Sequence, residues 1–128
     1  MDDEKRVTLC IEDNRSNIAL LRAILDVRPD LELISTMEGG LGIDLARKHL
    51  PALIVLDLQL PDLPGHEVLA KLRSSEDTHH IPIVVTSAHD TPELIKGLLE
   101  QGAAAYLTKP LDILEFCRVL DEQISRRQ

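Results

Sequence analysis

The chain has 128 residues, a length that suits one compact domain, and we expect a single domain over residues 1–128. Apolar residues make up 44% of the chain and aromatic residues only 2%, so its core must consist of Leu, Ile, Val and Ala. The formal net charge of −8 argues against direct nucleic-acid binding, which needs a basic surface. No apolar stretch approaches the roughly 18 residues of a membrane span, and we expect no membrane insertion.

The N-terminal sequence and the two cysteines indicate the cellular compartment in which we expect the protein. The N-terminal sequence MDDEKR is charged and lacks the apolar segment of a signal peptide. Cys10 lies in an apolar run and Cys117 in a helical pattern, and two such cysteines form neither a disulfide framework nor a metal-ligand pattern. We interpret both as small hydrophobic residues in a reducing compartment, and we expect a cytoplasmic protein.

Two kinds of segment alternate along the chain. Short apolar runs occur at residues 7–11, 31–35, 52–56, 81–85 and 103–107. Uninterrupted apolar runs of this length predict strands that are buried on both faces, as in a parallel sheet.

Helical patterns, with apolar residues three or four positions apart, lie between and after these runs. They are marked by Ile18, Leu21 and Leu25; by Leu41 and Leu45; by Val68, Leu69 and Leu72; by Leu94, Ile95, Leu98 and Leu99; and by Ile113, Cys117, Leu120 and Ile124. The fourth has the clearest start, because Thr91 is a good N-cap and Pro92 suits the first helical position. Five strands alternating with five helices predict an α/β, doubly wound (βα)5 fold of the flavodoxin-like kind, with a parallel five-stranded sheet in the order 2-1-3-4-5.

Chemically active side chains follow four of the five predicted strands. The first strand is followed by Glu12 and Asp13, the third by Asp57, the fourth by Ser87 and Ala88, and the fifth by Thr108, Lys109 and Pro110. Ligands of doubly wound sheets bind beyond the carboxyl ends of the strands, near the point where the strand order reverses. The first and third strands are neighbours in the expected order, which would bring Glu12, Asp13 and Asp57 together.

Three carboxylates in one crevice repel each other, and a hard cation with oxygen ligands offsets this repulsion. We expect Mg²⁺, because it accepts a few carboxylates and keeps water molecules for an incoming phosphate. Lys109 supplies a second positive charge, and Ser87 supplies a neutral hydroxyl. This set of groups suits a phosphoryl group, with Asp57 as the attacking carboxylate.

Four motifs at these strand ends resemble the receiver domain of two-component response regulators. They are CIEDN at residues 10–14, LIVLDLQLPDLPG at 53–65, IPIVVTSAH at 81–89 and GAAAYLTKP at 102–110. The resemblance covers roughly residues 5–124. It implies a phosphoprotein that acts as a signalling switch or in a phosphorelay, and a regulatory domain rather than an enzyme, although one that assists its own phosphotransfer and dephosphorylation.

The resemblance implies a role for each matching residue. Asp57 would accept a phosphoryl group from a histidine kinase or a histidine phosphotransfer protein. Asp13 would bind Mg²⁺ directly and Glu12 directly or through water, with Asp57 and the backbone carbonyl of Gln59 as further ligands. The phosphoryl oxygens would be bound by Lys109, by Ser87 and by the backbone N–H of Ala88.

The resemblance also implies a switch. Ser87 and Tyr106 would rearrange after phosphorylation and change the surface of the fourth helix, the fifth strand and the fifth helix. That surface would contact a downstream protein target, and it could form a homodimer. The Lys109–Pro110 peptide would be cis. The chain would be either a stand-alone regulator or a receiver excised from a hybrid histidine kinase.

Three positions differ from the usual family pattern or leave a choice open. The acidic pair is Glu-Asp rather than Asp-Asp, and Pro64 stands where an acidic residue often precedes the glycine. Thr86 competes with Ser87 as the hydroxyl, and counting from Pro82 favours Ser87.

Gln59 and His89 lie close to the expected phosphoryl pocket, and we expect them to tune the hydrolysis rate. An unchanged phosphoryl lifetime after their substitution would refute that expectation.

Two other classes of protein share this layout. An Asp-nucleophile phosphatase usually carries a second acid two residues after the nucleophile, where this chain has Gln59. A flavodoxin-like flavin binder needs a Ser/Thr-rich phosphate loop after the first strand and aromatic side chains around the ring. This chain has acids in that loop, and it has one Phe and one Tyr in all.

Overall fold

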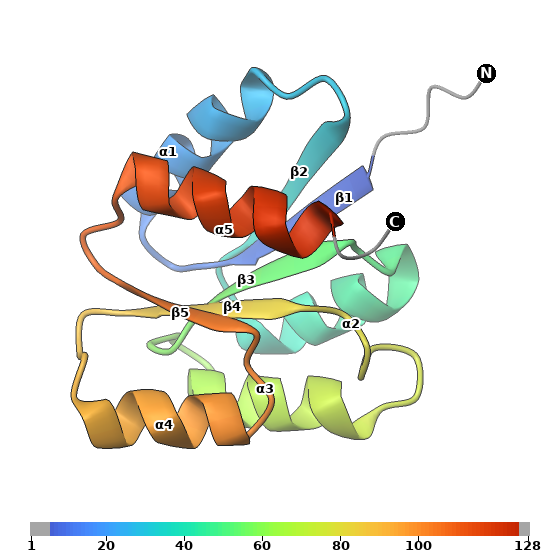
Figure 1. The fold of residues 1–128 in the computed structure, drawn as a ribbon. Coiled ribbons are helices and arrows are strands. Elements are labelled where there is room, and N and C mark those ends of the chain that lie inside the picture. Colours follow the sequence, from blue (N-terminus) through green and yellow to red (C-terminus); the bar gives the residue numbers. More distant parts are fainter. Residues whose placement is uncertain (1–5, 126–128) are drawn as a thin grey trace.

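The computed structural model describes residues 6–125, and the elements alternate strand and helix throughout (Figure 1). Their bounds are β1 (Arg6–Ile11), α1 (Arg15–Asp26), β2 (Leu31–Thr36), α2 (Gly39–His49), β3 (Leu53–Asp57), α3 (Gly65–Ser74), β4 (Ile83–Ser87), α4 (Pro92–Glu100), β5 (Ala105–Thr108) and α5 (Ile113–Ser125). The first five residues of the charged N-terminal segment lie outside the described residues.

The five strands form one parallel sheet in the order β2-β1-β3-β4-β5. This confirms the doubly wound fold and the strand order that the alternating pattern predicts. β1 and β3 are paired neighbours, with Ile11 of β1 opposite Leu56 of β3. The residues that follow these two strands therefore leave the sheet side by side.

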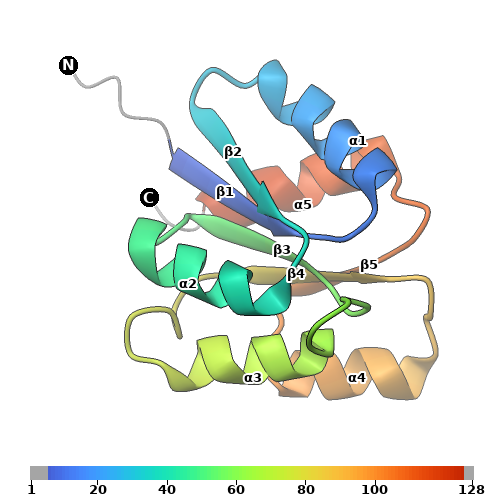
Figure 2. The same cartoon turned by 180° about the vertical axis from the view of Figure 1, so that it is seen from behind.

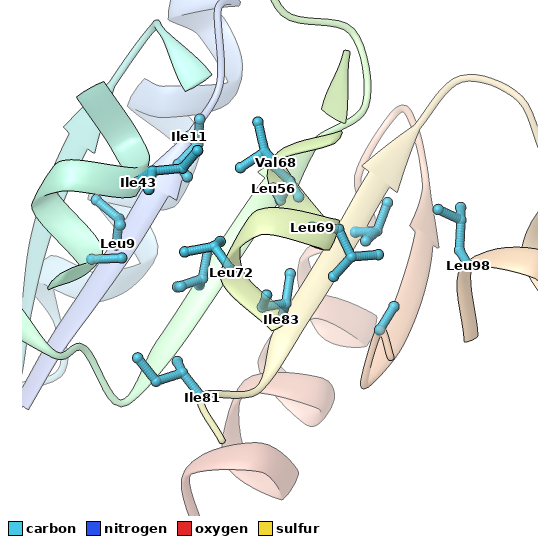
Figure 3. Packing of buried hydrophobic residues seen from close by; sticks show 14 residues of the cluster. Leu9, Ile11, Ile43, Leu56, Val68, Leu69, Leu72, Ile81, Ile83 and Leu98 are labelled. Atoms are coloured by element: carbon cyan, nitrogen blue, oxygen red, sulfur yellow. The ribbon is translucent and has the colours of Figure 1, made fainter. Parts of the chain in front are cut away.

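Helices cover both faces of the sheet, with α1 and α5 on one side and α2, α3 and α4 on the other (Figures 1 and 2). Each face has its own core, because successive residues of a strand point to opposite faces. Leu9, Leu56 and Ile83 pack with Val68 and Leu72 in the core under α2, α3 and α4 (Figure 3). The core under α1 and α5 is formed by strand residues such as Cys10, Val55 and Val84 together with Leu21, Leu25, Phe116 and Leu120.

Helix starts follow the capping residues of the sequence. The side chain of Asn14 accepts a hydrogen bond from the Asn17 N–H at 3.1 Å and caps α1. Thr91 caps α4 in the same way, and Pro92 is the first helical residue, as the sequence predicts. Each cap satisfies one N–H that the helix itself leaves without a partner.

Two strands begin two residues later than the apolar runs predict. The runs at 81–85 and 103–107 correspond to the strands Ile83–Ser87 and Ala105–Thr108. Ile81 and Ala103 are buried in the core, but they precede the strands as parts of the incoming loops. The strands instead continue into polar residues, because backbone pairing extends to Ser87 and Thr108 regardless of their side chains.

Both cysteines are free; Cys10 is buried, and Cys117 is half-buried on α5. Burial raises the pKa of the Cys10 thiol, and the negative charge of Glu12 adds to that effect. No helix within residues 6–125 combines the length and the apolar composition needed to cross a membrane.

Candidate functional site

Three carboxylates meet where β1 and β3 leave the sheet. Asp57 is the last residue of β3, and Glu12 directly follows β1; both are buried, with 2% and 1% exposure. Asp13 lies beside them and is exposed to solvent. One oxygen of each carboxylate lies within 4.8 Å of the other two. The neighbouring positions of β1 and β3 thus produce a compact acidic cluster with one open side.

Lys109 places a positive charge against two of these acids. Its Nζ lies 3.0 Å from Glu12 Oε2 and 3.2 Å from Asp57 Oδ2. The backbone N–H of Lys109 donates to the Ser87 carbonyl at 2.8 Å, which continues the β4–β5 pairing beyond the last residue of β5. The Lys109–Pro110 peptide is cis, as the resemblance implies. The ammonium group, which comes from the loop after β5, therefore contacts the acids at the ends of both β1 and β3.

The electrostatics of the cluster reflect burial and charge together. Burial raises the pKa of the Asp57 carboxyl, and the charge of Glu12 adds to this rise; the Gln59 N–H bond and Lys109 oppose it. Burial by itself would lower the pKa of Lys109, but the hydrogen bond to Glu12 and the charges of Glu12 and Asp57 outweigh it, so the pKa is raised. Lys109 therefore stays protonated while the cluster carries more acid than base.

Backbone donors fix the two buried carboxylates. Gln59 donates its N–H to Asp57 Oδ1 at 3.0 Å. Glu12 Oε2 accepts from the Asn14 N–H at 3.1 Å and lies 3.5 Å from Asn17 Nδ2. Each oxygen of Asp57 thus has one partner, Gln59 for Oδ1 and Lys109 for Oδ2. This arrangement holds the carboxylate in one orientation.

Hydroxyl and amide groups surround the acidic cluster. Ser87 and Thr86 are both buried at the end of β4, and Ser87 Oγ accepts from the His89 N–H at 3.1 Å. Thr86 Oγ1 is buried and has no hydrogen-bond partner within residues 6–125. Ala88, directly after β4, is exposed. The side chains of Gln59 and His89, which come from different loops, meet at 3.3 Å between nitrogens.

Tyr106 lies on β5 and is half-buried. Its hydroxyl is shielded from solvent and, among the described residues, has no hydrogen-bond partner. An open groove of about 600 Å³ lies along α4, with an apolar floor that includes Ile95 and Leu99. The groove and the Tyr106 hydroxyl belong to neighbouring elements, because α4 packs against β5.

The sequence analysis missed the role of Asp62 in the loop after β3. Its carboxylate accepts hydrogen bonds from the N–H groups of Gly39 and Gly40 at 2.8 and 2.9 Å, 22 or 23 residues earlier in the chain. In the sequence, α2 opens with two glycines, and the residue before them is Glu38 rather than a usual capping residue. In the structure, Glu38 makes no side-chain cap, which leaves the first N–H groups of α2 to another partner. Sequence spacing does not reveal a cap supplied from another loop.

Known proteins resemble this chain in both sequence and structure. The family model described as "Response regulator receiver domain" matches residues 8–121. The polar-differentiation response regulator DivK of Brucella ovis is 33% identical over 112 residues, covering 88% of this chain and 90% of that protein. The DivK protein of Brucella anthropi is 32% identical over the same length.

Solved structures with the same fold include metal-bound ones. The receiver domain of the sensor histidine kinase PA1611 from Pseudomonas aeruginosa, with a magnesium ion coordinated in its active-site cleft, is 25% identical with a TM-score of 0.84, covering 94% of this chain and 98% of that one. The Mn²⁺-bound response regulator Rcp1 is 27% identical with a TM-score of 0.77, covering 91% and 90%. A Francisella receiver domain, at 22% identity and a TM-score of 0.89 over 97% and 100%, shows the fold.

Proposed function

The chain belongs to the response regulator receiver domain family of two-component signalling, and from this premise we propose that it is a phosphorylation-dependent switch whose phosphoacceptor is Asp57. The observation that carries the proposal is the position of Lys109, whose Nζ lies 3.0 Å from Glu12 and 3.2 Å from Asp57. An ammonium group held beside a buried carboxylate can bind the oxygens of an incoming phosphoryl group. We propose a histidine kinase or a histidine phosphotransfer protein as the donor.

The acidic cluster suits Mg²⁺, because it offers only oxygen donors and carries an excess of negative charge. Glu12, Asp13, Asp57 and the backbone carbonyl of Gln59 would hold the ion. When bound, Mg²⁺ would supply positive charge that neutralises the carboxylates and the phosphoryl oxygens.

The proposed transfer uses groups that the fold already holds in place. An Asp57 oxygen attacks the phosphorus of a phosphohistidine, the new O–P bond forms, and the P–N bond breaks with its electron pair going to the imidazole. Lys109 binds the transferred oxygens, and Ser87 and the Ala88 N–H supply further donors. The product is an acyl phosphate on Asp57.

The output of the switch is proposed to be a protein contact. Phosphorylation replaces the single negative charge of the Asp57 carboxylate with a phosphoryl group that carries about −1.5 to −2 charges beside Lys109. Ser87 would then turn toward the phosphoryl group, and Tyr106 would take a new position on β5. A shift from mostly inactive to mostly active requires roughly 3–5 kcal/mol of differential stabilisation, which two or three charge-assisted hydrogen bonds can supply. The surface of α4, β5 and α5 would bind a downstream target, or a second copy, in the cytoplasm.

The test is phosphoryl incorporation from a small acyl-phosphate donor with Mg²⁺, followed by intact-mass spectrometry. We expect one phosphoryl group on the wild type and none on Asp57→Asn, because the amide is not a nucleophile of this kind. Asp44→Asn, an exposed carboxylate in the middle of α2, is the matched control and should label like the wild type. Equal labelling of Asp57→Asn and wild type would refute the assignment.

The two other classes of protein receive no support from the site. The position two residues after Asp57 is Gln59, whose side chain meets His89 rather than supplying an acid. The loop after β1 carries Glu12 and Asp13, so the place where a flavin phosphate would bind is negatively charged. Turnover of phosphomonoesters would instead support the phosphatase, and a coloured purified protein would support the flavin binder.

A further inference from the structure

Asp62 connects two parts of the molecule that are distant in sequence. It lies in the loop at residues 58–64, between β3 and α3. Its Oδ1 accepts the Gly39 N–H at 2.8 Å, and its Oδ2 accepts the Gly40 N–H at 2.9 Å. Both carboxylate oxygens are therefore bound to the first turn of α2, where backbone N–H groups and the helix dipole favour a negative charge.

The first turn of α2 is packed tightly against this loop. A Cβ atom on Gly39 would lie 2.7 Å from Val68 Cγ2 of α3 and 3.3 Å from Leu60 Cδ1 of the loop, so any larger residue would require these side chains to shift. Glu38, at the capping position of α2, makes no side-chain cap. The helix therefore depends on Asp62 for two of its free N–H groups, and the loop depends on the helix for an anchor.

The same loop holds the groups next to Asp57. At its start, the Leu58 N–H donates to the Thr86 carbonyl at 3.0 Å, and the Leu58 carbonyl accepts from the Gly65 N–H at 2.8 Å. Gln59 follows, with its N–H on Asp57 Oδ1 at 3.0 Å and its side chain exposed. Between Leu58 and Gly65, two side chains tie the loop to other parts of the chain: Asp62 binds α2, and Gln59 contacts His89 in the loop after β4.

We propose that Asp62 is a positioning residue for the phosphoacceptor site. By tying the loop to α2, it holds the Gln59 backbone where its N–H binds Asp57 and where its carbonyl serves the metal. The part that concerns the metal rests on the proposed function, whereas the part that concerns the Gln59 N–H does not. A carboxylate is required because it has two equivalent acceptors, while an asparagine has one.

The first experiment needs no metal. Amide hydrogen exchange of ¹⁵N-labelled protein in EDTA compares wild type, Asp62→Asn, Asp62→Ala and the control Thr91→Ala, which removes the cap of α4. We expect Gln59 to exchange about fivefold faster in Asp62→Ala, the scale of one lost helix cap, and by less in Asp62→Asn, which keeps one acceptor. Gln59 should exchange at the wild-type rate in Thr91→Ala.

The second experiment is a titration of the same four proteins with MgCl₂, followed by NMR. We expect Asp62→Ala to bind Mg²⁺ about three- to tenfold more weakly, near the lower range for residues that orient metal ligands. Thr91→Ala should bind like the wild type. Asp62→Asn should fall between the two, and it carries the test if Asp62→Ala does not fold.

The outcomes separate this inference from the proposed function. If Asp62→Ala loses stability as Thr91→Ala does, but keeps wild-type Gln59 exchange and Mg²⁺ affinity, Asp62 is only a helix cap and the inference is wrong. If the wild type itself binds no Mg²⁺ and takes up no phosphoryl group, the proposed function fails, and the exchange of Gln59 in EDTA still decides the role of Asp62.

Discussion

Asp57 and Lys109 illustrate how a charged residue at a strand end differs from a core residue. Asp57 ends a strand whose other four residues are apolar and buried, so its carboxylate shares their dry surroundings. Burial raises its pKa, which means that the charged form, which the proposed attack on phosphorus uses, is disfavoured there. Lys109 and the Gln59 N–H each bind one oxygen and offset that cost. These two partners therefore stabilise a charged carboxylate in surroundings that would otherwise strongly disfavour it.

Asp62 gives a pH-dependent contribution to stability. The N–H bonds from Gly40 and Gly39 lower the pKa of its carboxyl below the ordinary value of 3.8. Because the folded-state pKa is the lower one, this stabilisation is present above pH 3.8 and is lost as the pH falls through the folded-state value. Asp62→Asn should therefore unfold at lower urea concentration than wild type at pH 7, and the difference should shrink below about pH 4.

The control for this prediction is Asp44→Asn, which makes the same change in net charge on α2, the helix that Asp62 caps. Its urea midpoint should differ little from that of the wild type at pH 7. A midpoint for Asp62→Asn that stays below the wild-type midpoint by the same amount at every pH would contradict the prediction.

At the scale of elements, we expect alanine substitution of two helical glycines to change the free energy of unfolding in opposite directions. A Cβ on Gly65, the first residue of α3, would lie 2.4 Å from Leu58 Cα and 2.6 Å from the Asp57 carbonyl oxygen, and backbone atoms cannot move aside cheaply. Gly65→Ala should lower the free energy of unfolding by about 1–3 kcal/mol. Gly97, inside α4, has open space around it, and Gly97→Ala should raise stability by about 0.5–1 kcal/mol.

Urea unfolding of both variants, fitted with a common m-value, measures the two effects. The pair controls for the chemical change itself, because each variant adds one methyl group to a helix. A neutral Gly65→Ala would mean that α3 can shift away from the end of β3, and that the backbone around Asp57 is not rigid.

The elements were largely predictable from the sequence because local patterns encode them. Short, mostly apolar runs identified the five strands, and Thr91 with Pro92 identified the start of α4. The starts of β4 and β5 were placed two residues too early, since Ile81 and Ala103 are apolar for reasons of core packing rather than strand pairing. The strand order then gave the grouping of Glu12, Asp13 and Asp57.

Contacts between distant loops could not be predicted in this way. Neither the bond from Asp62 to α2 nor the meeting of Gln59 with His89 has a sequence spacing that marks it. Both depend on how the loops at the strand ends approach each other in three dimensions. The proximity of the strand-end acids, in contrast, follows from the strand order.

At the scale of the whole molecule, we expect the acidic cluster to couple the proposed Mg²⁺ binding to folding. The chain carries a net charge of −8, and three of its acids are gathered at one edge of the sheet. A ligand that binds only the folded state stabilises it by mass action, by about 2.7 kcal/mol when its concentration is 100 times its Kd. Mg²⁺ should therefore raise the Tm of this protein by several degrees.

Thermal unfolding, followed by circular dichroism with EDTA or with MgCl₂, measures this rise, and KCl at matched ionic strength controls for general screening of the negative charge. Asp57→Asn should show a smaller rise, because one proposed ligand has lost its charge, whereas Asp44→Asn should show the full rise. A Tm increase that KCl reproduces, or that Asp57→Asn retains in full, would place the effect of Mg²⁺ on the acidic surface at large rather than on the strand-end cluster. We expect the Mg²⁺-specific rise that Asp57→Asn reduces, because Glu12 and Asp57 are buried and Asp13 is the one member of the cluster that is exposed to solvent.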